Sequence, residues 1–265
     1  MLFDAHCHLQ DPRLEEFLEN VLKSCRSVGI LRWMVNATRE SDWDIVSKLC
    51  EAHPGIYASY GLHPWWQKER SLHWEEDLKQ RLLNDPAAGV GETGLDRWME
   101  NFDFDDQKDV LVKHLQIACD LKRPISLHCL KAWPELKAVV SRFLPVASGI
   151  LLHSYSGPRD MIPYWVKAGA YFSFSPAFVH PRKSHVREAF MEIPLDRILI
   201  ETDAPDMAPP IEDAIHISES EKLPELMNHP INLLVSLRAL AVDRKISEIS
   251  LAEILTENTC ALFGL

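Results

Sequence analysis

Short, almost continuously apolar runs alternate with longer segments along the whole chain. Unbroken apolar runs of this kind are typical of parallel strands whose two faces are both covered. The pattern therefore predicts buried parallel strands, and they fall at residues 2–7, 31–37, 56–60, 87–91, 124–129, 149–153, 170–174 and 197–202.

The segments between these runs predict helices. Before Pro124, for example, Val110, Leu111, Leu115 and Ala118 recur at near-helical spacing. Near the end of the chain, Ser250 with Glu253 predicts the capping box of a last helix. The other helices are expected at residues 13–28, 41–53, 71–84, 104–121, 132–143, 159–168 and 184–192.

Eight strands that alternate with helices favour a closed parallel barrel or a doubly wound sheet. The length of 265 residues matches the roughly 250 residues of a barrel of eight β/α units. We therefore expect an α/β protein with a TIM-like (β/α)8 barrel, formed as a single domain by residues 1–265. The proline-rich stretch 204–230 is expected to be irregular and to leave from the face that holds the active site.

Charge and composition limit the classes of partner that the protein is expected to bind. The formal net charge of −11 argues against a basic surface that grips long nucleic acid, although bound cations can supply positive charge locally. No signal peptide and no apolar run of about 20 residues is evident, so we expect a cytoplasmic protein without a membrane partner. The six cysteines contain no C-x-x-C pair and are expected to be free thiols. The oligomeric state stays open, with a monomer plausible.

Histidines and carboxylates close several of the predicted strands. Side chains alternate along a strand, so His6 and His8 should share one face, with Asp4 one step deeper on the same face. Further ionisable residues close the apolar runs of strands four, five, six and eight, and a barrel would bring them together at its catalytic end. These residues are Glu92, His128, His153 and Asp203.

Four imidazoles and several carboxylates exceed the needs of one tetrahedral zinc ion. Two divalent ions, Zn²⁺, Mn²⁺ or Mg²⁺, are the economical interpretation, with Glu92 as a bridging ligand and a third ion as an option near Glu201. Asp203 would hold a metal and orient or deprotonate the attacking water. The expected catalytic residues are Asp203, Glu92 and His63.

Three residues just beyond the strands are candidates for substrate contact. His63 lies in a Gly-Leu-His-Pro turn after the third strand and could meet a substrate oxyanion or assist a leaving group. Asp96 follows Glu92 closely and either orders its loop or binds substrate. Trp65 either stacks against a base or walls the pocket.

The chain resembles the TatD family of metal-dependent deoxyribonucleases, within the amidohydrolase superfamily. The resemblance rests on FDAHCHL at residues 3–9, GLHP at 61–64, GETGLD at 91–96, LHC at 127–129, LHSYSG at 152–157 and LIETDAP at 199–205. It implies that His6 and His8 bind one metal, that Glu92 bridges, that His128 and His153 bind a second metal, and that Glu201 serves an additional one. It also implies 3′→5′ hydrolysis of DNA, with single strands or 3′ ends as substrate.

Two departures from the family pattern leave the substrate open. An arginine common two residues after the fifth-strand histidine is replaced by Leu130, and a basic stretch near the end is replaced by residues 226–230. Hydrolysis of an amide or ester in a small molecule is therefore the alternative function. A non-catalytic binding module is a third interpretation, but a mere scaffold has no need for buried, mutually repelling carboxylates.

Overall fold

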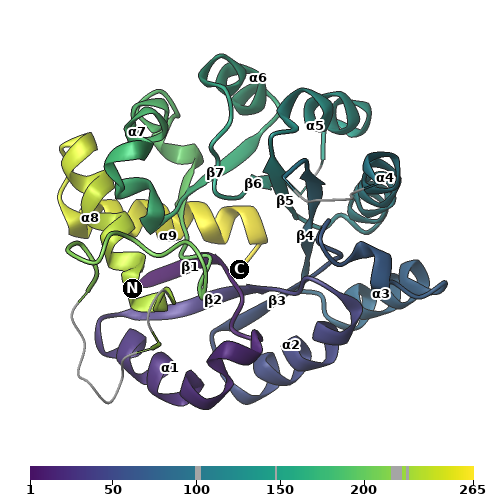
Figure 1. Ribbon diagram of the computed structural model, residues 1–265, viewed down its shortest axis with the longest axis horizontal. Helices are drawn as coiled ribbons and strands as arrows, with labels where there is room; N and C mark the ends of the chain where they lie inside the picture. Colours follow the sequence, from purple (N-terminus) through teal and green to yellow (C-terminus); the bar gives the residue numbers. More distant parts are fainter. Residues whose placement is uncertain (99–102, 147, 216–222, 225–226) are drawn as a thin grey trace.

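Parallel strands follow one another around a barrel, and each strand pairs with the next one in the sequence (Figure 1). The structure is a computed structural model, and it describes residues 1–98, 103–146, 148–215, 223–224 and 227–265. The eight strands are β1 (Leu2–Cys7), β2 (Ile30–Asn36), β3 (Ile56–Tyr60), β4 (Gly89–Asp96), β5 (Ile125–Leu130), β6 (Ile150–Leu152), β7 (Ala170–Phe174) and β8 (Ile198–Ile200). The (β/α)8 prediction is confirmed.

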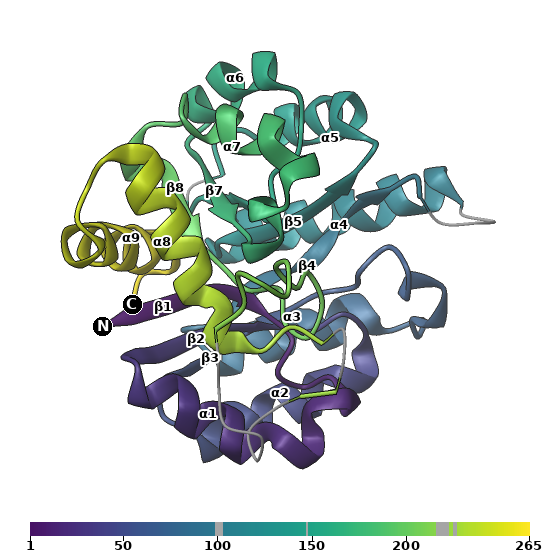
Figure 2. The same cartoon turned by 60° about the vertical axis from the view of Figure 1, so that its left-hand side comes forward.

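The helices of the described residues are α1 (Leu18–Ser27), α2 (Glu40–Ala52), α3 (Trp74–Asn84), α4 (Phe104–Leu121), α5 (Trp133–Val140), α6 (Ile162–Lys167), α7 (Ser184–Phe190), α8 (Leu233–Arg244) and α9 (Glu248–Phe263). Helices α1 to α8 surround the strands in the order of the chain, and α9 passes across one end of the barrel (Figures 1 and 2). Among the described residues, no helix is both long and apolar enough to cross a bilayer.

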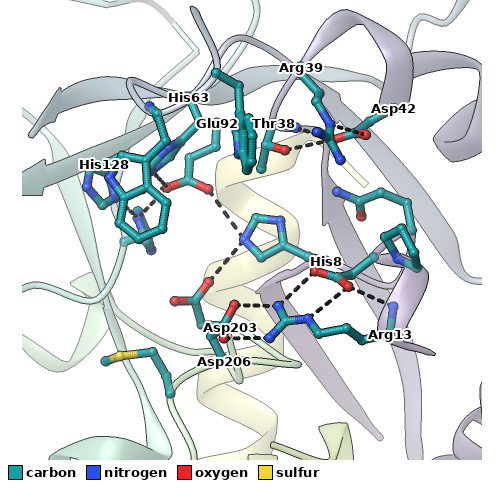
Figure 3. A pocket seen from close by; sticks show the side chains of 17 residues that line it. His8, Arg13, Thr38, Arg39, Asp42, His63, Glu92, His128, Asp203 and Asp206 are labelled. Atoms are coloured by element: carbon teal, nitrogen blue, oxygen red, sulfur yellow. Dashed lines mark hydrogen bonds and ion pairs between the residues drawn. The ribbon is translucent and has the colours of Figure 1, made fainter. Parts of the chain in front are cut away.

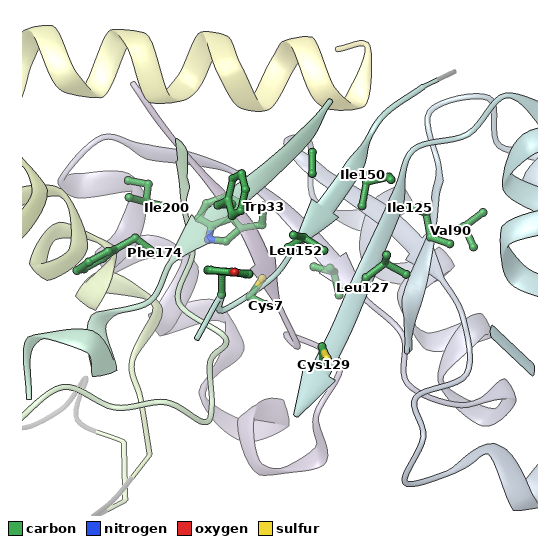
Figure 4. Packing of buried hydrophobic residues seen from close by; sticks show 14 of the residues in the cluster. Cys7, Trp33, Val90, Ile125, Leu127, Cys129, Ile150, Leu152, Phe174 and Ile200 are labelled. Atoms are coloured by element: carbon green, nitrogen blue, oxygen red, sulfur yellow. The ribbon is translucent and has the colours of Figure 1, made fainter. Parts of the chain in front are cut away.

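The strands bury apolar side chains on both faces. One face packs against the helices through residues such as Val90, Leu127, Leu152 and Phe174 (Figure 4). On the opposite face a smaller cluster contains Phe3, Ala5, Met34, Leu151 and Leu199, into which Leu262 and Phe263 of α9 pack. This double burial explains the unbroken apolar runs in the sequence.

Polar contacts join the first strand to the segment that follows the last one. The backbone N–H of Asp203 donates to the carbonyl of His6 at 2.9 Å, and that of His8 donates to Ala204 at 2.8 Å. The buried Asp4 carboxyl accepts from the N–H of Thr202 at 2.9 Å and from its hydroxyl. Burial raises the pKa of Asp4 to about 8, against the lowering effect of the Thr202 hydrogen bonds.

The prediction that Asp4 shares a face with His6 is wrong. Phe3 and Ala5 lie in the interior cluster, so Asp4 between them points to the other face. The pairing of β1 with β2 then shifts register between Asp4 and Cys7. An extra residue of this kind inverts the alternation and turns His6 back toward the interior.

Three other element predictions need correction. The last helix, α9, begins at Glu248 and is capped by Ser247, whose side chain accepts from the N–H of Ser250, so the capping box at Ser250 is wrong. Helix α8 is not predicted by the pattern, because its apolar residues lie all round it rather than on one stripe. Strand β4 continues to Asp96, so Glu92 lies within a strand rather than at its end. Where it is described, the 204–230 stretch contains turns and only the start of a short 3-10 helix, Pro230–Asn232.

Candidate metal centre

Four histidine side chains, which lie in or just after β1, β5 and β6, converge on the carboxylate of Glu92. Its Oε2 atom lies 3.3 Å from Nε2 of His6 and 3.4 Å from Nε2 of His8. Its Oε1 atom lies 3.0 Å from Nδ1 of His128 and 2.8 Å from Nε2 of His153. The two oxygens of Glu92 therefore face two different histidine pairs.

The backbone of β4 comes unusually close to β5 on either side of Glu92. A Cβ atom on Gly91 would lie 2.8 Å from the carbonyl oxygen of Ser126, and one on Gly94 would lie 1.9 Å from that of His128. Both glycines also have positive φ, at 139° and 157°. Only glycine permits this approach, which brings Glu92 up to the histidines of β5 and β6.

The remaining histidine nitrogens are mostly held by partners behind the cluster. Nδ1 of His8 lies 2.8 Å from the carbonyl oxygen of Asn36, Nδ1 of His6 lies 3.1 Å from Oγ of Ser126, and Nε2 of His128 lies 3.0 Å from Asp96 Oδ2. Contacts of this kind are what orients an imidazole toward a metal. Nε2 of His6, by contrast, is buried and makes no hydrogen bond within the described part of the chain.

Asp203 completes one side of the cluster. Its Oδ1 atom lies 3.1 Å from Nε2 of His8 and 3.6 Å from Nε2 of His6. The residue has a left-handed backbone, with φ of 55°, which aspartate and asparagine tolerate better than most side chains. Its own backbone N–H donates to the carbonyl of His6, and this fixes Asp203 beside His6 and His8.

Burial and mutual charge set the protonation of these groups. Burial raises the pKa of Glu92, but the charge of His153 and the hydrogen bonds with His128 and His153 outweigh it and hold that pKa well below its usual value. Burial lowers the pKa of His8, but its hydrogen bond with Asp203 and the charge of Glu92 raise it to about 9. A metal ligand must be deprotonated, so a divalent ion would take the place of these protons.

These observations fit a group of metal ions. Within the described residues, ligand atoms that could share an ion occur in three sets: His6, His8 and Asp203; His6, His153 and Glu201; and His63, Glu92 and His128. The donors are imidazole nitrogens and carboxylate oxygens, which suit Zn²⁺ and Mn²⁺. The buried Nε2 of His6, without a hydrogen bond, is the kind of atom that an ion would satisfy.

Glu201 lies apart from the carboxylate of Glu92. It is fully buried, and its Oε1 atom accepts from the N–H of Ser154 at 2.7 Å and from the hydroxyl of the same residue, while Oε2 accepts from the hydroxyl of Ser173. Its Oε1 atom lies 3.9 Å from Nδ1 of His153, a member of the cluster. Ion binding by Glu201 would have to compete with these serine contacts.

His63 lies beside the cluster and is held neutral. Its Nδ1 atom accepts from the N–H of Trp65 at 3.1 Å, which leaves the proton on Nε2, 3.4 Å from Oε1 of Glu92. Burial lowers the pKa of His63 to about 3, and the neighbouring His128 adds to the effect, against the opposing charge of Glu92. The residue is thus a hydrogen-bond donor at Nε2.

Asp96 and Trp65 are linked to each other and to the cluster. Oδ2 of Asp96 lies 3.0 Å from Nε2 of His128 and accepts from Nε1 of Trp65 at 2.8 Å, while Oδ1 accepts from the N–H of Trp98 at 2.6 Å. Asp96 is fully buried, whereas Trp65 is 54% exposed. The carboxylate therefore faces protein groups, and the indole presents a surface to solvent.

The sequence reasoning missed His114 and Gln107, both on α4. His114 accepts the N–H of Leu62 through Nε2 at 3.2 Å. Gln107 bonds both the N–H and the carbonyl of Asp96, at 2.8 and 2.9 Å. Both residues are buried polar positions on a predicted helix, and such positions need partners. That was the available signal.

A cavity of about 340 Å³ opens above the cluster (Figure 3). Its floor contains His8, Glu92, His128, His153 and Asp203. Its wall is formed by Gln10, Asp11, Pro12, Arg13, Thr38, Arg39, Asp42, His63, Trp65, Trp66, Asp206 and Met207. Among the tryptophans that the structure describes, Trp65 and Trp66 line this cavity.

Comparison with known proteins identifies relatives along the whole chain. The uncharacterized metal-dependent hydrolase YjjV of Escherichia coli K12 is 31% identical over 206 residues, which are 77% of this chain and 79% of that protein. The 3′-5′ ssDNA/RNA exonuclease TatD of Pantoea vagans is 27% identical over 210 residues, which are 78% of this chain and 81% of that protein.

The fold agrees equally well. The crystal structure of the TatD homolog YJJV from Escherichia coli K12 superposes with a TM-score of 0.90 at 27% identity, and the match covers 100% of this chain and 98% of that one. The family model described as TatD related DNase matches residues 3–264. The chain therefore belongs to the TatD-related deoxyribonuclease family.

Proposed function

We propose that this protein is a metal-dependent hydrolase that removes nucleotides from the 3′ ends of DNA. One observation carries the proposal: at the floor of a small cavity, one oxygen of Glu92 faces His6 and His8, and the other faces His128 and His153. The relatives named as a metal-dependent hydrolase and as a 3′-5′ exonuclease support it. No observation favours the small-molecule amidohydrolase or the non-catalytic module.

The arrangement around Glu92 supports two metal ions. His6 and His8, with Asp203, would hold one, His128 and His153 would hold the other, and Glu92 would bridge them through its two oxygens. Such ions would supply the positive charge that activates water and stabilises the phosphoryl oxygens. Zn²⁺ and Mn²⁺ suit the imidazole-rich set, Mg²⁺ suits the carboxylates, and Glu201 would serve a third ion if one binds.

The side chains around the ions would divide the remaining work. Asp203 would accept a proton from the attacking water, since its oxygen already points between His6 and His8. His63, neutral and protonated on Nε2, would donate a hydrogen bond to an oxygen of the reacting phosphate. A hydrogen bond aimed at developing charge stabilises a transition state more than it does in water.

Asp96 and Trp65 would act differently from each other. The buried Asp96 would position His128 rather than meet substrate, because both of its oxygens already accept hydrogen bonds. Trp65 would offer its exposed ring to a terminal base, since its Nε1 is fixed on Asp96 and its edge lies against His63, with ring centres 5.4 Å apart. Stacking of this kind contributes about 1–3 kcal/mol per base.

The size and charge of the cavity support a strand end as substrate. Its volume of about 340 Å³ lies near the lower end of the ~300–1,000 Å³ range of small-molecule sites. Its lining carries Asp11, Asp42, Glu92, Asp203 and Asp206 against two arginines. An acidic cavity of this size has no basic track along which the middle of a duplex could bind.

The decisive assay uses metal-depleted protein with defined nucleic acids. Single-stranded, duplex and circular DNA, RNA and a panel of amides and esters are incubated with Zn²⁺, Mn²⁺ or Mg²⁺. We expect 5′-labelled single strands to shorten stepwise from the 3′ end, circular DNA to resist, and a chelator to stop the reaction. Cleavage of amides or esters alone, or nicking of circles, would refute the proposal. Elemental analysis of the saturated protein should give at least two ions per chain.

A further inference from the structure

Two arginines line the cavity above the metal centre, and their surroundings differ. Both Arg13 and Arg39 belong to the wall (Figure 3). Substrate phosphates would approach this wall when the reacting phosphate reaches the floor. Whether either arginine can bind a phosphate depends on the N–H groups that protein carboxylates leave available.

Arg13 has almost no donor left. Its Nε and Nη2 atoms donate to Asp11 at 3.0 and 2.8 Å, and its Nη1 and Nη2 atoms donate to Asp206 at 3.0 and 2.8 Å. Two carboxylates thus surround one guanidinium and outweigh its charge. Arg13 ties the segment after β1 to the segment after β8, and it is not available to an anion.

In Arg39, the two terminal nitrogens of the guanidinium, Nη1 and Nη2, make no hydrogen bond to the described residues. Its Nε atom donates to Asp42 Oδ1 at 3.2 Å, and among the described residues this is the only hydrogen bond of the Arg39 side chain. Glu69 is 4.0 Å from Nη1, beyond hydrogen-bond distance, and its side chain is 56% exposed. Asp42 is occupied elsewhere as well, since its Oδ2 atom accepts from both the N–H and the hydroxyl of Thr38 at 3.1 and 2.7 Å.

The ring of Trp66 supports the guanidinium of Arg39. The guanidinium carbon lies 4.5 Å from the centre of the indole. Stacking of this kind fixes the plane of the fork and leaves its N–H edge open, which matches the two oxygens of a phosphate. The side chain of Arg39 is 29% exposed, so the fork is partly shielded from water.

The position of Arg39 at the start of α2 also favours a role in binding a ligand. It is the residue before the first turn of α2, and its side chain makes no capping hydrogen bond. A positive charge at the positive end of a helix is unfavourable, and aspartate or serine would serve the helix better. A local rule broken at the wall of a cavity is common at functional sites.

We propose that Arg39, stacked on Trp66, binds a second phosphate of the substrate, next to the one that is hydrolysed. This proposal rests on the proposed function, and it gives Arg39 the role of selecting nucleic acid strands over isolated phosphodiesters. It also supplies a phosphate contact from α2 in a chain that has Leu130 two residues after His128.

The test compares substrates that differ by one phosphate. The dinucleotide dTpdT carries only the reacting phosphodiester, whereas pdTpdT and dTpdTp carry an additional phosphate on the 5′ or the 3′ side. We would measure kcat/KM for each with the Mn²⁺-loaded enzyme, and also Ki for thymidine 3′,5′-bisphosphate against thymidine 5′-monophosphate. The wild type should prefer one of the two-phosphate dinucleotides and the bisphosphate.

Arg39→Gln should reduce both preferences by about tenfold to a hundredfold, which is the range expected for hydrogen bonds to a charged group. Arg39→Lys should restore part of each, because it keeps the charge but loses the planar fork. Arg238→Gln, an exposed arginine outside the cavity wall, is the control and should change neither ratio. Each preference is a ratio within one protein sample, so partial misfolding cancels.

An equal loss on substrates with one and two phosphates, or no loss at all, would overturn the role of Arg39. Such a result would leave the nuclease proposal intact, because the wild type would still hydrolyse the dinucleotides. If the wild type hydrolyses none of the dinucleotides with any metal, the proposed function itself fails.

Discussion

Each histidine of the metal centre presents a nitrogen that its other contacts select. Three of the four have their second nitrogen held, by Asn36, Ser126 and Asp96, and this leaves Nε2 of His8, Nε2 of His6 and Nδ1 of His128 facing inward. Preorganised imidazoles lose little freedom when an ion binds. Burying these polar groups together makes the free energy of folding less favourable, and the binding of an ion would offset this effect.

Asp203 is the residue whose replacement should separate chemistry from structure. Asparagine keeps its shape and tolerates the left-handed backbone, with φ of 55°, but it cannot accept a proton. Asp203→Asn should therefore lower kcat by ~10²–10⁴-fold or more while the protein stays folded. Rates near the wild-type value, in a sample shown by elemental analysis to be metal-loaded, would remove Asp203 from the mechanism.

His114 supports a prediction about stability in acid. It is fully buried, its Nδ1 lies 2.8 Å from the carbonyl oxygen of Val110, and burial lowers its pKa from 6.5 to about 4. In the unfolded chain the imidazole binds a proton below about pH 6.5, and in the folded chain only near pH 4. Its contribution is thus fully present above pH 6.5 and is lost as the pH falls toward 4, by at most about 3 kcal/mol.

His114→Gln should remove this part of the pH dependence, because glutamine can still accept the N–H of Leu62 but does not titrate in this range. Urea unfolding of both proteins at several values between about pH 7 and pH 4 would measure it. We expect the free energy of unfolding to fall less steeply in the variant. Parallel curves would mean that His114 is already protonated in the folded protein.

Several residues of the site could be predicted because their chemistry shows in the local pattern. A histidine or carboxylate that closes an apolar run, as His128 and His153 do, is visible in the sequence alone. The pairing of Asp96 with His128 is not visible, since it depends on the register between β4 and β5. The face of Asp4 was misjudged for a similar reason, because a shift in strand register leaves no mark in the hydrophobic pattern.

At the scale of elements, the segments after β1 and β8 are joined by Arg13. Its guanidinium bridges Asp11 and Asp206, and both Asp206 and Met207 line the cavity. The start of the long stretch 204–230 is thereby placed against the wall, while residues 216–222 and 225–226 of that stretch lie outside the described residues. We predict that this stretch influences the choice of substrate more than the chemical step.

Asp206→Asn tests this prediction with one atom changed. It should weaken the bridge, raise KM for oligonucleotides several-fold and alter the ranking of substrates, while kcat and metal content change little. The comparison variant is Asp196→Asn, an exposed aspartate outside the cavity that lies 3.7 Å from Arg197. An unchanged ranking in Asp206→Asn would make the bridge a passive connection.

Elements were predictable where one physical signal dominates. The strands emerge from their apolar runs, and α4 has the predicted bounds, 104–121. Helix α8 was missed because apolar residues occur on every side of it, including the exposed Val242, so its sequence lacks the stripe by which helices are recognised. The start of α9 was misplaced because Ser247 and Ser250 are both acceptable caps, and only tertiary contacts choose between them.

At the scale of the whole molecule, the net charge of −11 affects how the protein would bind DNA. Long-range attraction to a polyanion is absent, so binding should depend on the few phosphates that reach the metals and Arg39. Each neutralised phosphate contributes about −0.7 to the slope of log affinity against log salt for single strands. We therefore predict a slope between about −1 and −3, measured with a 3′-tailed oligonucleotide and the Asp203→Asn variant. A slope several times steeper would require a basic surface elsewhere on the protein.

The bridge between the first and last strands has a consequence for biosynthesis. The metal centre needs His6 from the start of the chain and Asp203 from three quarters of the way along it. These two residues are held together by the hydrogen bond between their backbones and by the hydrogen bond from Thr202 to Asp4. A ribosome must therefore release more than two hundred residues before the ligands can meet. Half-made chains carry His6, His8, Glu92 and His128 but no Asp203, so a nascent or truncated nuclease would be harmless to the nucleic acid around it.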